Sequence, residues 1–347
     1  MRRLLYICIL VLSAMSMMAE NYASNARAEQ VERTMVITYD LSKTTNVRLL
    51  VATNMSNDFK EVKKVTGAVG KNVQAGANRQ ITWNVLEEYD RFVADGVRFK
   101  VETYGAEGIG VFSVSSSKKV TFSPGNLQYH PANKLWRFAE SQLDYIGDAN
   151  SNCSSTYSGW LDLFGWSTSA TYFGVSTSRN NYSGSFVDWG RNKIGNDTPN
   201  TWHTLSKDEW KYLLDVRPNA KYLKGIACVC GVNGLILLPD TWTCPLGVTF
   251  KSGYHSLKFS PNSYGKYQTF TADQWSKFEA AGAVFLPAAG YRDGSNVNYV
   301  QIYGVYWSAT DGNSYYRGCL GFYSDEALMP SNYSNFGQSV RLVKDLQ

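Results

Sequence analysis

The stretch that most constrains the fold is residues 285–343, where three motifs with strand-like patterning enclose polar loops. FLPAAGYRDG opens the stretch, YGVYWSAT lies at residues 303–310, and GQSVRLV closes it at residues 337–343. The last two motifs predict buried strands, because apolar side chains alternate along them. Alternation also places Trp307 on the opposite face of its strand from Tyr306, which predicts a core position rather than a ligand contact.

The loops between these motifs have the composition of a recognition surface. Between Asp293 and Ser339, the residues Asn, Tyr, Ser, Gly and Asp occupy 28 of 47 positions, and Lys is absent. Tyr offers a large contact area at low entropic cost, and Asn, Ser and Gly offer adaptable hydrogen bonds, as in antibody paratopes. The alternative is that Gly, Asn and Ser mark turns and Tyr lies on strands. The recognition hypothesis selects ten candidate ligand-binding residues: Asn296, Asn298, Tyr299, Asp311, Asn313, Tyr315, Tyr316, Asn332, Tyr333 and Asn335.

The N-terminus has the pattern of a secretory signal peptide. Arg2 and Arg3 precede a short apolar run at residues 4–12, which small residues and Met follow. We therefore expect residues 1–19 to be removed, with cleavage sites available up to Ala28. The apolar run is too short to span a bilayer, and no later segment is long and apolar enough. The sequence predicts an exported protein of the cell surface, periplasm or extracellular space, without a transmembrane segment.

Charge and cysteine content argue against several classes of function. The formal net charge is +5, two units of which lie in the signal peptide, and this is too small to indicate nucleic-acid binding. No C-x-x-C occurs and the three histidines are scattered, so no metal site is predicted. Cys228 and Cys230 lie on one face of an expected strand, which disfavours a bond between them. One loop leaves a structural calcium ion as an alternative, through the oxygen atoms of Asp144, Asp148, Asn150 and Asn152.

Residues 31–105 predict an all-β first domain. Short polar or glycine-bearing segments separate four strand-like runs, a spacing typical of a sandwich. The runs are residues 35–41, 47–53, 79–85 and 97–104. Through VTGAVGKNVQAGANRQITW, residues 65–83, the domain resembles a small immunoglobulin-like domain of exported Bacteroidetes proteins, which implies a spacer. Trp83 leaves a glycan-binding sandwich as an alternative, and residues 106–119 form the expected linker.

The second expected domain spans residues 120–347 and combines strands with helices. FSPGNLQYHPANKLWRFAE, at residues 122–140, predicts two strands around a turn. Asn233 and Gly234 predict the type I′ turn of a hairpin, with a buried strand after it. Two capping boxes predict helices, formed by Ser206 with Glu209 and by Thr271 with Gln274. Together these elements indicate an α+β domain.

The order of motifs in this second domain resembles that of the Fibrobacter succinogenes major paralogous domain (FISUMP) family of the Bacteroidetes. The resemblance covers residues 120–343 and rests on FSPGNLQY, WRFAE, GWLDLFGW, LSKDEWKYLL, GVNGLILLPD, GAVFLPAAGYRDG, YWSAT and GQSVRLV. It implies a C-type-lectin-like fold, related in shape to the formylglycine-generating enzyme, behind the immunoglobulin-like domain. It implies no general activity.

The sequence lacks the residues of several familiar catalytic and sugar-binding sites. Formylglycine-generating enzymes use a close pair of cysteines near the C-terminus, where this chain has only Cys319. Neither a GxSxG elbow nor an HExxH helix occurs. Asp162 and Glu209 fit a turn carboxylate and a helix cap better than a glycosidase pair. Calcium-dependent lectins use EPN or QPD with WND, whereas Trp307 here precedes Ser308. The sequence therefore predicts no catalysis and no cofactor.

We expect an exported, non-enzymatic binding or adhesion protein that recognises a glycan or a protein through its C-terminal loops. One alternative is a structural subunit or the tip of a surface appendage, because the first domain also suits a spacer. Another is a variable protein of a diversity-generating retroelement. Such proteins carry a lectin-like fold with a C-terminal variable region rich in Asn, Tyr, Ser and Asp, and the loops of this chain look similar.

Overall fold

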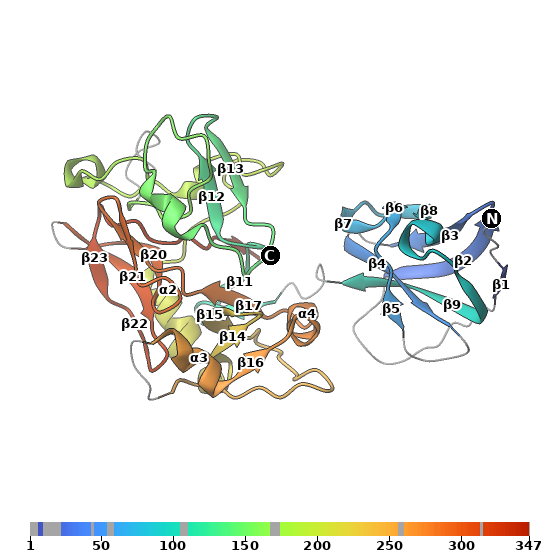
Figure 1. Cartoon of the computed structure of the whole chain (residues 1–347). Coiled ribbons are helices and arrows are strands. Elements are labelled where there is room, and N and C mark those ends of the chain that lie inside the picture. The colour runs from blue at the N-terminus through green and yellow to red at the C-terminus, as the bar shows by residue number, and fades with distance from the viewer. Residues whose placement is uncertain are drawn as a thin grey trace. The chain divides into compact units, whose positions relative to one another are not determined.

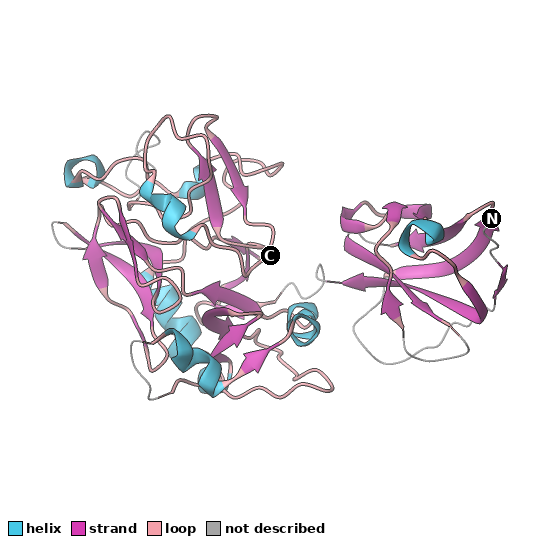
Figure 2. Cartoon of the chain, viewed as in Figure 1, coloured by secondary structure: helices cyan, strands magenta, loops and turns pink. Residues whose placement is uncertain are grey.

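The chain is rich in β-strands and divides into two compact units. The computed structural model describes residues 6–9, 22–42, 45–53, 59–104, 110–166, 174–255, 260–312 and 315–346. Strands account for 41% of the chain and helices for 15%, which confirms a β-rich fold (Figure 2). The division falls between unit 1, Met1–Gly108, and unit 2, Ile109–Gln347, which Figure 1 colours blue to cyan and cyan to red.

Unit 1 consists of two sheets around one core. Its elements are β1 (Tyr6–Ile9), β2 (Ala23–Val31), β3 (Thr34–Leu41), β4 (Thr45–Ala52), β5 (Lys60–Glu61), β6 (Val65–Gly67), β7 (Gly70–Val73), β8 (Gly76–Trp83), α1 (Val85–Glu88) and β9 (Val93–Tyr104). One sheet has the order β1-β9-β4-β5, with β7 also beside β4, and the other has the order β2-β3-β8-β6. Alternate side chains such as Ile37, Leu49, Trp83 and Val101 fill the space between the sheets. The four predicted strand runs are confirmed in β3, β4, β8 and β9.

The predicted start of this unit, residue 31, is wrong by one strand. Strand β2 pairs with β3 along its length, from Ala23 opposite Leu41 to Val31 opposite Thr34. Its sequence, ASNARAEQV, has few apolar side chains and is largely exposed, so it lacks the hydrophobic alternation that marks a strand. Within the expected signal peptide, the described strand β1 pairs in parallel with β9.

Unit 2 holds three cores around a mixed set of sheets. Its strands are β10 (Phe112–Ser113), β11 (Lys119–Phe122), β12 (Leu127–His130), β13 (Leu135–Phe138), β14 (Lys224–Val229), β15 (Val232–Leu237), β16 (Thr269–Phe270), β17 (Val284–Pro287), β18 (Tyr291–Asp293), β19 (Asn296–Asn298), β20 (Gly304–Asp311), β21 (Tyr316–Phe322), β22 (Ala327–Leu328), β23 (Ser331–Tyr333) and β24 (Val343–Asp345). Its helical elements are η1 (Gly147–Ser151), η2 (Arg179–Tyr182), η3 (Trp189–Arg191), α2 (Lys207–Lys211), η4 (Tyr212–Val216), η5 (Ala220–Tyr222), α3 (Pro261–Tyr267) and α4 (Ala272–Ala280). None of the helices in the described part of the chain is long and apolar enough to cross a membrane.

Two sheets of unit 2 are buried on both faces. In the sheet β16-β14-β15-β17, Leu235 faces one core and its neighbour Ile236 faces another. In the sheet of β20 to β23, Tyr306 faces the first of these cores, and Trp307 faces the third. The predicted alternation of Tyr306 and Trp307 is therefore confirmed, and both side chains are buried. Figure 1 shows β20 to β23 together at the left of unit 2.

The segment 337–343 was expected to be one strand, but it is an extended thread between several segments. Successive residues pair with different partners, since Gly337 bridges to Arg292, Gln338 to Phe164 and Ser339 to Tyr306. Regular strand pairing begins only at Val343, in β24. All seven residues are buried. The alternation of apolar residues in this segment therefore does not mark a strand of one sheet. The segment is instead buried between several neighbouring segments.

The two predicted helix starts are confirmed, whereas the predicted position of the hairpin turn is wrong. Both capping boxes are present, at the starts of α2 and α4. The hairpin of β14 and β15 turns at Cys230 and Gly231, whose φ angles of 51° and 84° suit a type I′ turn. Asn233 lies inside β15 instead, where its buried amide donates to the carbonyls of Pro261 and Gln301. The Asn-Gly pair therefore serves a tertiary contact.

The predicted linker, 106–119, extends too far toward the C-terminus. Phe112 and Val114 are fully buried in the first core of unit 2. Strand β10 pairs with β11, and the backbone N–H of Ser113 donates to Asp240. Unit 2 thus begins about ten residues before the expected start at residue 120.

Candidate ligand-binding site

A continuous row of aromatic rings lies at the surface of unit 2. The rings of Tyr316 and Tyr333 have centroids 4.6 Å apart, and Phe336 follows Tyr333 at 5.4 Å. Tyr291 stacks on Phe336 at 5.4 Å and on Tyr299 at 5.9 Å. The row then continues through Tyr303 to Tyr323. We call these seven residues the aromatic strip: Tyr291, Tyr299, Tyr303, Tyr316, Tyr323, Tyr333 and Phe336.

Two backbone features hold the middle of the aromatic strip in place. Gly290, just before Tyr291, has φ of 73°, and a Cβ there would overlap the carbonyl oxygen of Asn298. Its N–H donates to the carbonyl of Tyr303 at 2.8 Å, which brings the two tyrosine segments together. Tyr299 itself has φ of 57°, an uncommon conformation for a residue with a large side chain. The fold thus holds the ring of Tyr299 on a constrained turn.

The aromatic strip is partly exposed, and burial affects the hydroxyl groups of three of its tyrosines. Tyr299 and Tyr316 are 48% and 43% exposed, and the other five rings are half-buried. Burial raises the pKa of Tyr323 to about 12 and also raises the pKa of Tyr291 and Tyr303. These three hydroxyls therefore stay protonated at ordinary pH, and a protonated phenol can both donate and accept hydrogen bonds.

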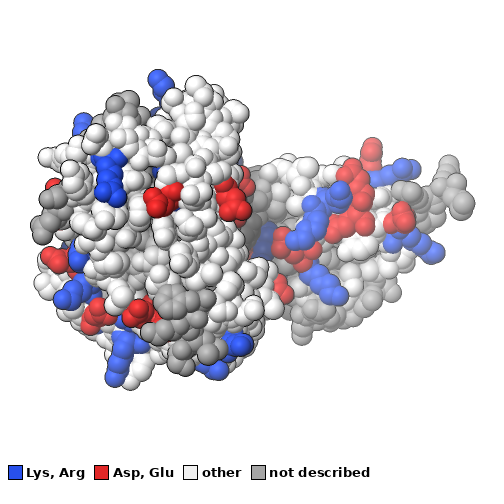
Figure 3. All heavy atoms as spheres, turned by 60° about the vertical axis from the view of Figure 1, so that its left-hand side comes forward, with Lys and Arg blue, Asp and Glu red and all other residues white. Residues whose placement is uncertain are grey.

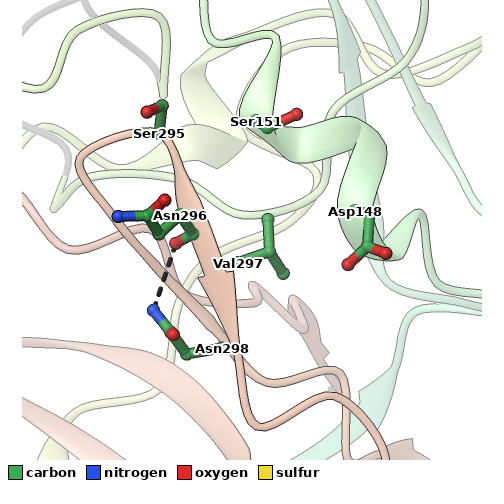
Figure 4. Close-up of a pocket in the computed structure, with 6 residues that line it drawn as sticks. All are labelled: Asp148, Ser151, Ser295, Asn296, Val297 and Asn298. Atoms are coloured by element: carbon green, nitrogen blue, oxygen red, sulfur yellow. Dashed lines mark hydrogen bonds between the residues drawn. The ribbon is translucent and has the colours of Figure 1, made fainter.

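Six of the ten predicted residues lie on the aromatic strip or beside it. Tyr299, Tyr316 and Tyr333 belong to the aromatic strip, and Tyr315, 50% exposed, precedes Tyr316. Asn296 and Asn298 line a shallow hollow with a volume of about 360 Å³, whose other walls include Asp148 and Ser151. Figure 4 shows this hollow between β19 and η1, with the Asn298 amide directed at the Asn296 carbonyl.

Three other predicted residues have structural partners, and Asn313 lies outside the described residues. Asn335 is only 7% exposed, and its amide donates to the Thr177 carbonyl at 3.3 Å, so its assignment as a ligand contact is wrong. Asp311 forms an ion pair with the buried Arg317 at 3.1 Å. Asn332 directs its amide at the sulfur of Cys319. These partners suggest that Asp311 and Asn332 support the loops rather than contact a ligand.

Sequence reasoning missed four members of the aromatic strip and a cation beside it. Tyr303 and Tyr323 belong to the Tyr-rich region, but neither stood in the loop clusters that were selected. Tyr291 lies inside the motif FLPAAGYRDG and Phe336 directly precedes GQSVRLV, and both motifs were expected to enclose the loops rather than contribute to the site. Arg179 places its guanidinium carbon 3.9 Å from the ring centroid of Tyr333. Nothing in the sequence near Arg179 indicates this contact, because more than 150 positions separate the two residues.

The loop considered for calcium uses its polar side chains internally. Asn150 is fully buried, accepts from the N–H groups of Asp162 and Leu163, and donates to Asp162 at 2.8 Å. Burial raises the pKa of Asp162 to about 6, although the hydrogen bonds that its carboxylate accepts from the Asn150 amide and the Ile146 N–H oppose the shift. Asp144 accepts from the N–H of Ser141. Among the described residues, no three or more His, Cys, Asp or Glu side chains group as a metal site would need.

The groups considered for catalysis are likewise engaged in the fold. Glu209 completes its capping box at Ser206 and accepts from Lys118 at 2.8 Å. Asp162 is bound to Asn150, as described above. Cys319 is buried, and burial raises the pKa of its thiol to about 12, so little thiolate forms at neutral pH.

Uncharged residues make up most of the visible surface on one side of unit 2 (Figure 3). Figure 3 brings forward the side of unit 2 that holds β20 to β23, and most atoms in view belong to uncharged residues. A ligand there would meet aromatic rings, hydroxyls and amides, with Arg179 as a nearby cation.

Comparison with known proteins adds one match. Residues 260–343 match a family described as a domain of unknown function (DUF8237). The match covers about a quarter of the chain and includes the whole aromatic strip. No curated protein and no solved structure matches the chain.

Proposed function

We propose that this chain is an exported, non-enzymatic binding protein that holds a glycan on the aromatic strip. The main support for the proposal is that the aromatic strip is continuous. Its seven rings come from loops separated by more than 30 residues and form one row. Loops held by a rigid scaffold are where recognition usually takes place.

The chemistry of the aromatic strip favours a sugar. Aromatic rings pack against the apolar C–H faces of sugar rings, and the tyrosine hydroxyls can bond to sugar hydroxyls. Asn298 supplies an amide beside Tyr299. Such a site needs neither the calcium motifs of lectins nor a deep pocket. A binding role also accounts for the partial exposure of the aromatic strip.

The resemblances drawn from the sequence support the same proposal. A C-type-lectin-like unit 2 of the FISUMP type would present its loops at one end of the domain, and an immunoglobulin-like unit 1 would act as a spacer. An N-terminal signal peptide would deliver the protein to the cell surface, the periplasm or the medium.

Removal of tyrosine rings is expected to weaken binding. With the purified protein on a glycan array, and then by calorimetry with a glycan so selected, we expect Tyr333→Ala to cost roughly 1–3 kcal/mol of binding free energy. Tyr315 and Tyr316 replaced together by Ala should weaken binding by roughly tenfold or more. Most single changes at the other positions should be nearly silent, because hot spots are few.

Tyr222→Ala is the matched control, since Tyr222 is 56% exposed and lies in η5, outside the strip. It should bind like the parent, and all variants should keep their circular dichroism and melting temperature. If the strip variants bind like the parent while changes in residues 31–105 abolish binding, the site lies in unit 1 and the proposal is wrong. Assembly of the isolated protein without glycan binding would favour a structural subunit.

Export predicts a new N-terminus in the mature protein. Cleavage after Ala28 would remove most of β2, which pairs with β3 at the edge of one sheet of unit 1. We therefore expect the signal peptide to be cleaved close to Ala19. Mass spectrometry of envelope and secreted fractions checks this. Retention of Met1 in envelope material would contradict export, and a lipid on a new N-terminal cysteine would contradict a freely exported protein.

A further inference from the structure

Arg179 is fixed against one end of the aromatic strip. Its guanidinium lies over the ring of Tyr333, and the hydroxyls of Tyr333 and Tyr316 are joined by a hydrogen bond of 2.8 Å. That bond raises the pKa of Tyr316, and the charge of Arg179 lowers it in part, as expected if the cation is close to both rings. Elements η2, β21 and β23 therefore meet at one cluster.

The segment that carries Arg179 is held by its neighbours. Tyr182, at the end of η2, is buried, and its hydroxyl donates to the Ser176 carbonyl at 2.8 Å. The amide of Asn335 donates to the carbonyl of Thr177. Asn335 thus connects the loop after β23 to the residues just before Arg179. The cation is placed by the fold, and its position does not depend on a ligand.

Charge is distributed unevenly along the aromatic strip. Arg179 is exposed and forms no ion pair with any acidic residue that the structure describes. Arg317, by contrast, is buried and paired with Asp311. At the opposite end, Asp325 and Glu326 lie close enough to raise the pKa of Tyr323, secondary to burial. The Tyr316–Tyr333 end therefore suits a negative charge, and the Tyr323 end does not.

We propose that the ligand is an acidic saccharide, whose carboxylate binds Arg179 while its ring packs against the exposed Tyr316, beside Tyr333. A guanidinium that lies over an aromatic ring still has N–H groups at its edge, and these match a carboxylate in a two-bond geometry. The tyrosine hydroxyls lie beside this position and bond to sugar hydroxyls. This inference rests on the proposed glycan-binding function and adds the charge and the direction of the ligand.

The test compares uronic-acid polysaccharides with their neutral forms. The probes are polygalacturonate, alginate and hyaluronan, each beside a carboxyl-reduced counterpart, with polyglutamate as an acidic peptide. We expect at least one acidic probe to bind the intact protein on the order of tenfold more tightly than its reduced form, since hydrogen bonds to charged groups are the stronger ones. That preference should shrink as salt rises.

Variants of Arg179 assign the preference to this residue. Arg179→Ala should lose the preference for the acidic probe and bind the reduced probe unchanged. Arg179→Lys should keep part of the preference for the acidic probe, because the ammonium keeps the positive charge but lacks the planar two-bond geometry. Arg191→Ala is the matched control, an exposed arginine of η3, and should bind like the parent.

The outcomes separate this inference from the proposed function. Equal affinity for acidic and reduced probes, with Arg179→Ala unchanged, overturns the acidic ligand and leaves glycan binding intact. Binding of polyglutamate alone overturns it in favour of an acidic protein partner. Binding of no probe overturns it as well, and the proposed function is then judged by neutral glycans on the array with the Tyr333→Ala variant.

Discussion

Trp307→Ala is expected to lower the free energy of unfolding of unit 2 by about 3–5 kcal/mol. Trp307 is 1% exposed and packs in the core that contains Phe164 and Trp166. Its indole N–H donates to the carbonyl of Phe164 at 2.6 Å, and its backbone N–H donates to Ser339. Alanine would leave a large cavity and would remove one of the two hydrogen bonds that the Phe164 carbonyl accepts, the other coming from the Gln338 N–H. Both effects destabilise the fold.

Urea titration followed by circular dichroism measures this loss. Trp307→Phe keeps most of the volume but not the hydrogen bond, so it should fall between the parent and the alanine variant. Trp160→Ala is the control, because Trp160 is only half-buried and has Arg137 over its ring. An alanine variant at residue 307 with unchanged melting temperature and lost ligand binding would place Trp307 in the site instead of the core.

Elements specified by nearby residues were predictable from the sequence. A capping box needs only two side chains three positions apart, so Ser206 and Thr271 identified their helices correctly. The alternation in β3 and β20 identified both strands, and in β20 it also separated Trp307 from Tyr306. In these cases the local preference and the tertiary fold agree.

Elements specified by distant partners were not predictable. The Asn233–Gly234 pair has the residues of a hairpin turn, but the contacts of Asn233 with Pro261 and Gln301 draw it into a strand. The turn moves to Cys230, which gives no such signal. Strand β2 and the thread at 337–343 fail for the same reason, since their partners are set by the fold.

The candidate site was predictable in composition but not in geometry. The abundance of Tyr pointed to Tyr299, Tyr316 and Tyr333, which the fold brings into one row. No periodic pattern connects Arg179 with Tyr333, and only the three-dimensional structure reveals their contact. Asn335 shows the opposite error, because a loop asparagine can be chosen for an internal hydrogen bond as readily as for a ligand.

Arg217→Ala is expected to destabilise unit 2 by about 3–5 kcal/mol, because it removes the buried partner of an ion pair whose other member, Asp240, is partly exposed. Arg217 is 2% exposed and donates to Asp240 at 3.0 Å. Its remaining N–H groups bond to the carbonyls of Leu213 and Leu238, which would be left without a donor. Asp240 also holds Ser113 of β10, so the loss should loosen the strand that begins unit 2.

Arg191→Ala is the matched control for this change, because Arg191 is an exposed arginine in η3 of the same unit. Surface substitutions of this kind change stability by no more than about 0.5 kcal/mol, so this variant should unfold almost like the parent. Arg217→Lys should recover part of the stability, since it keeps a charge near Asp240 but has too few donors for both carbonyls. Denaturant titrations of the three variants give the comparison. If Arg217→Ala and Arg191→Ala lose the same small amount, Arg217 does not link β10 to the rest of unit 2, and the start of the unit at Ile109 loses its energetic basis.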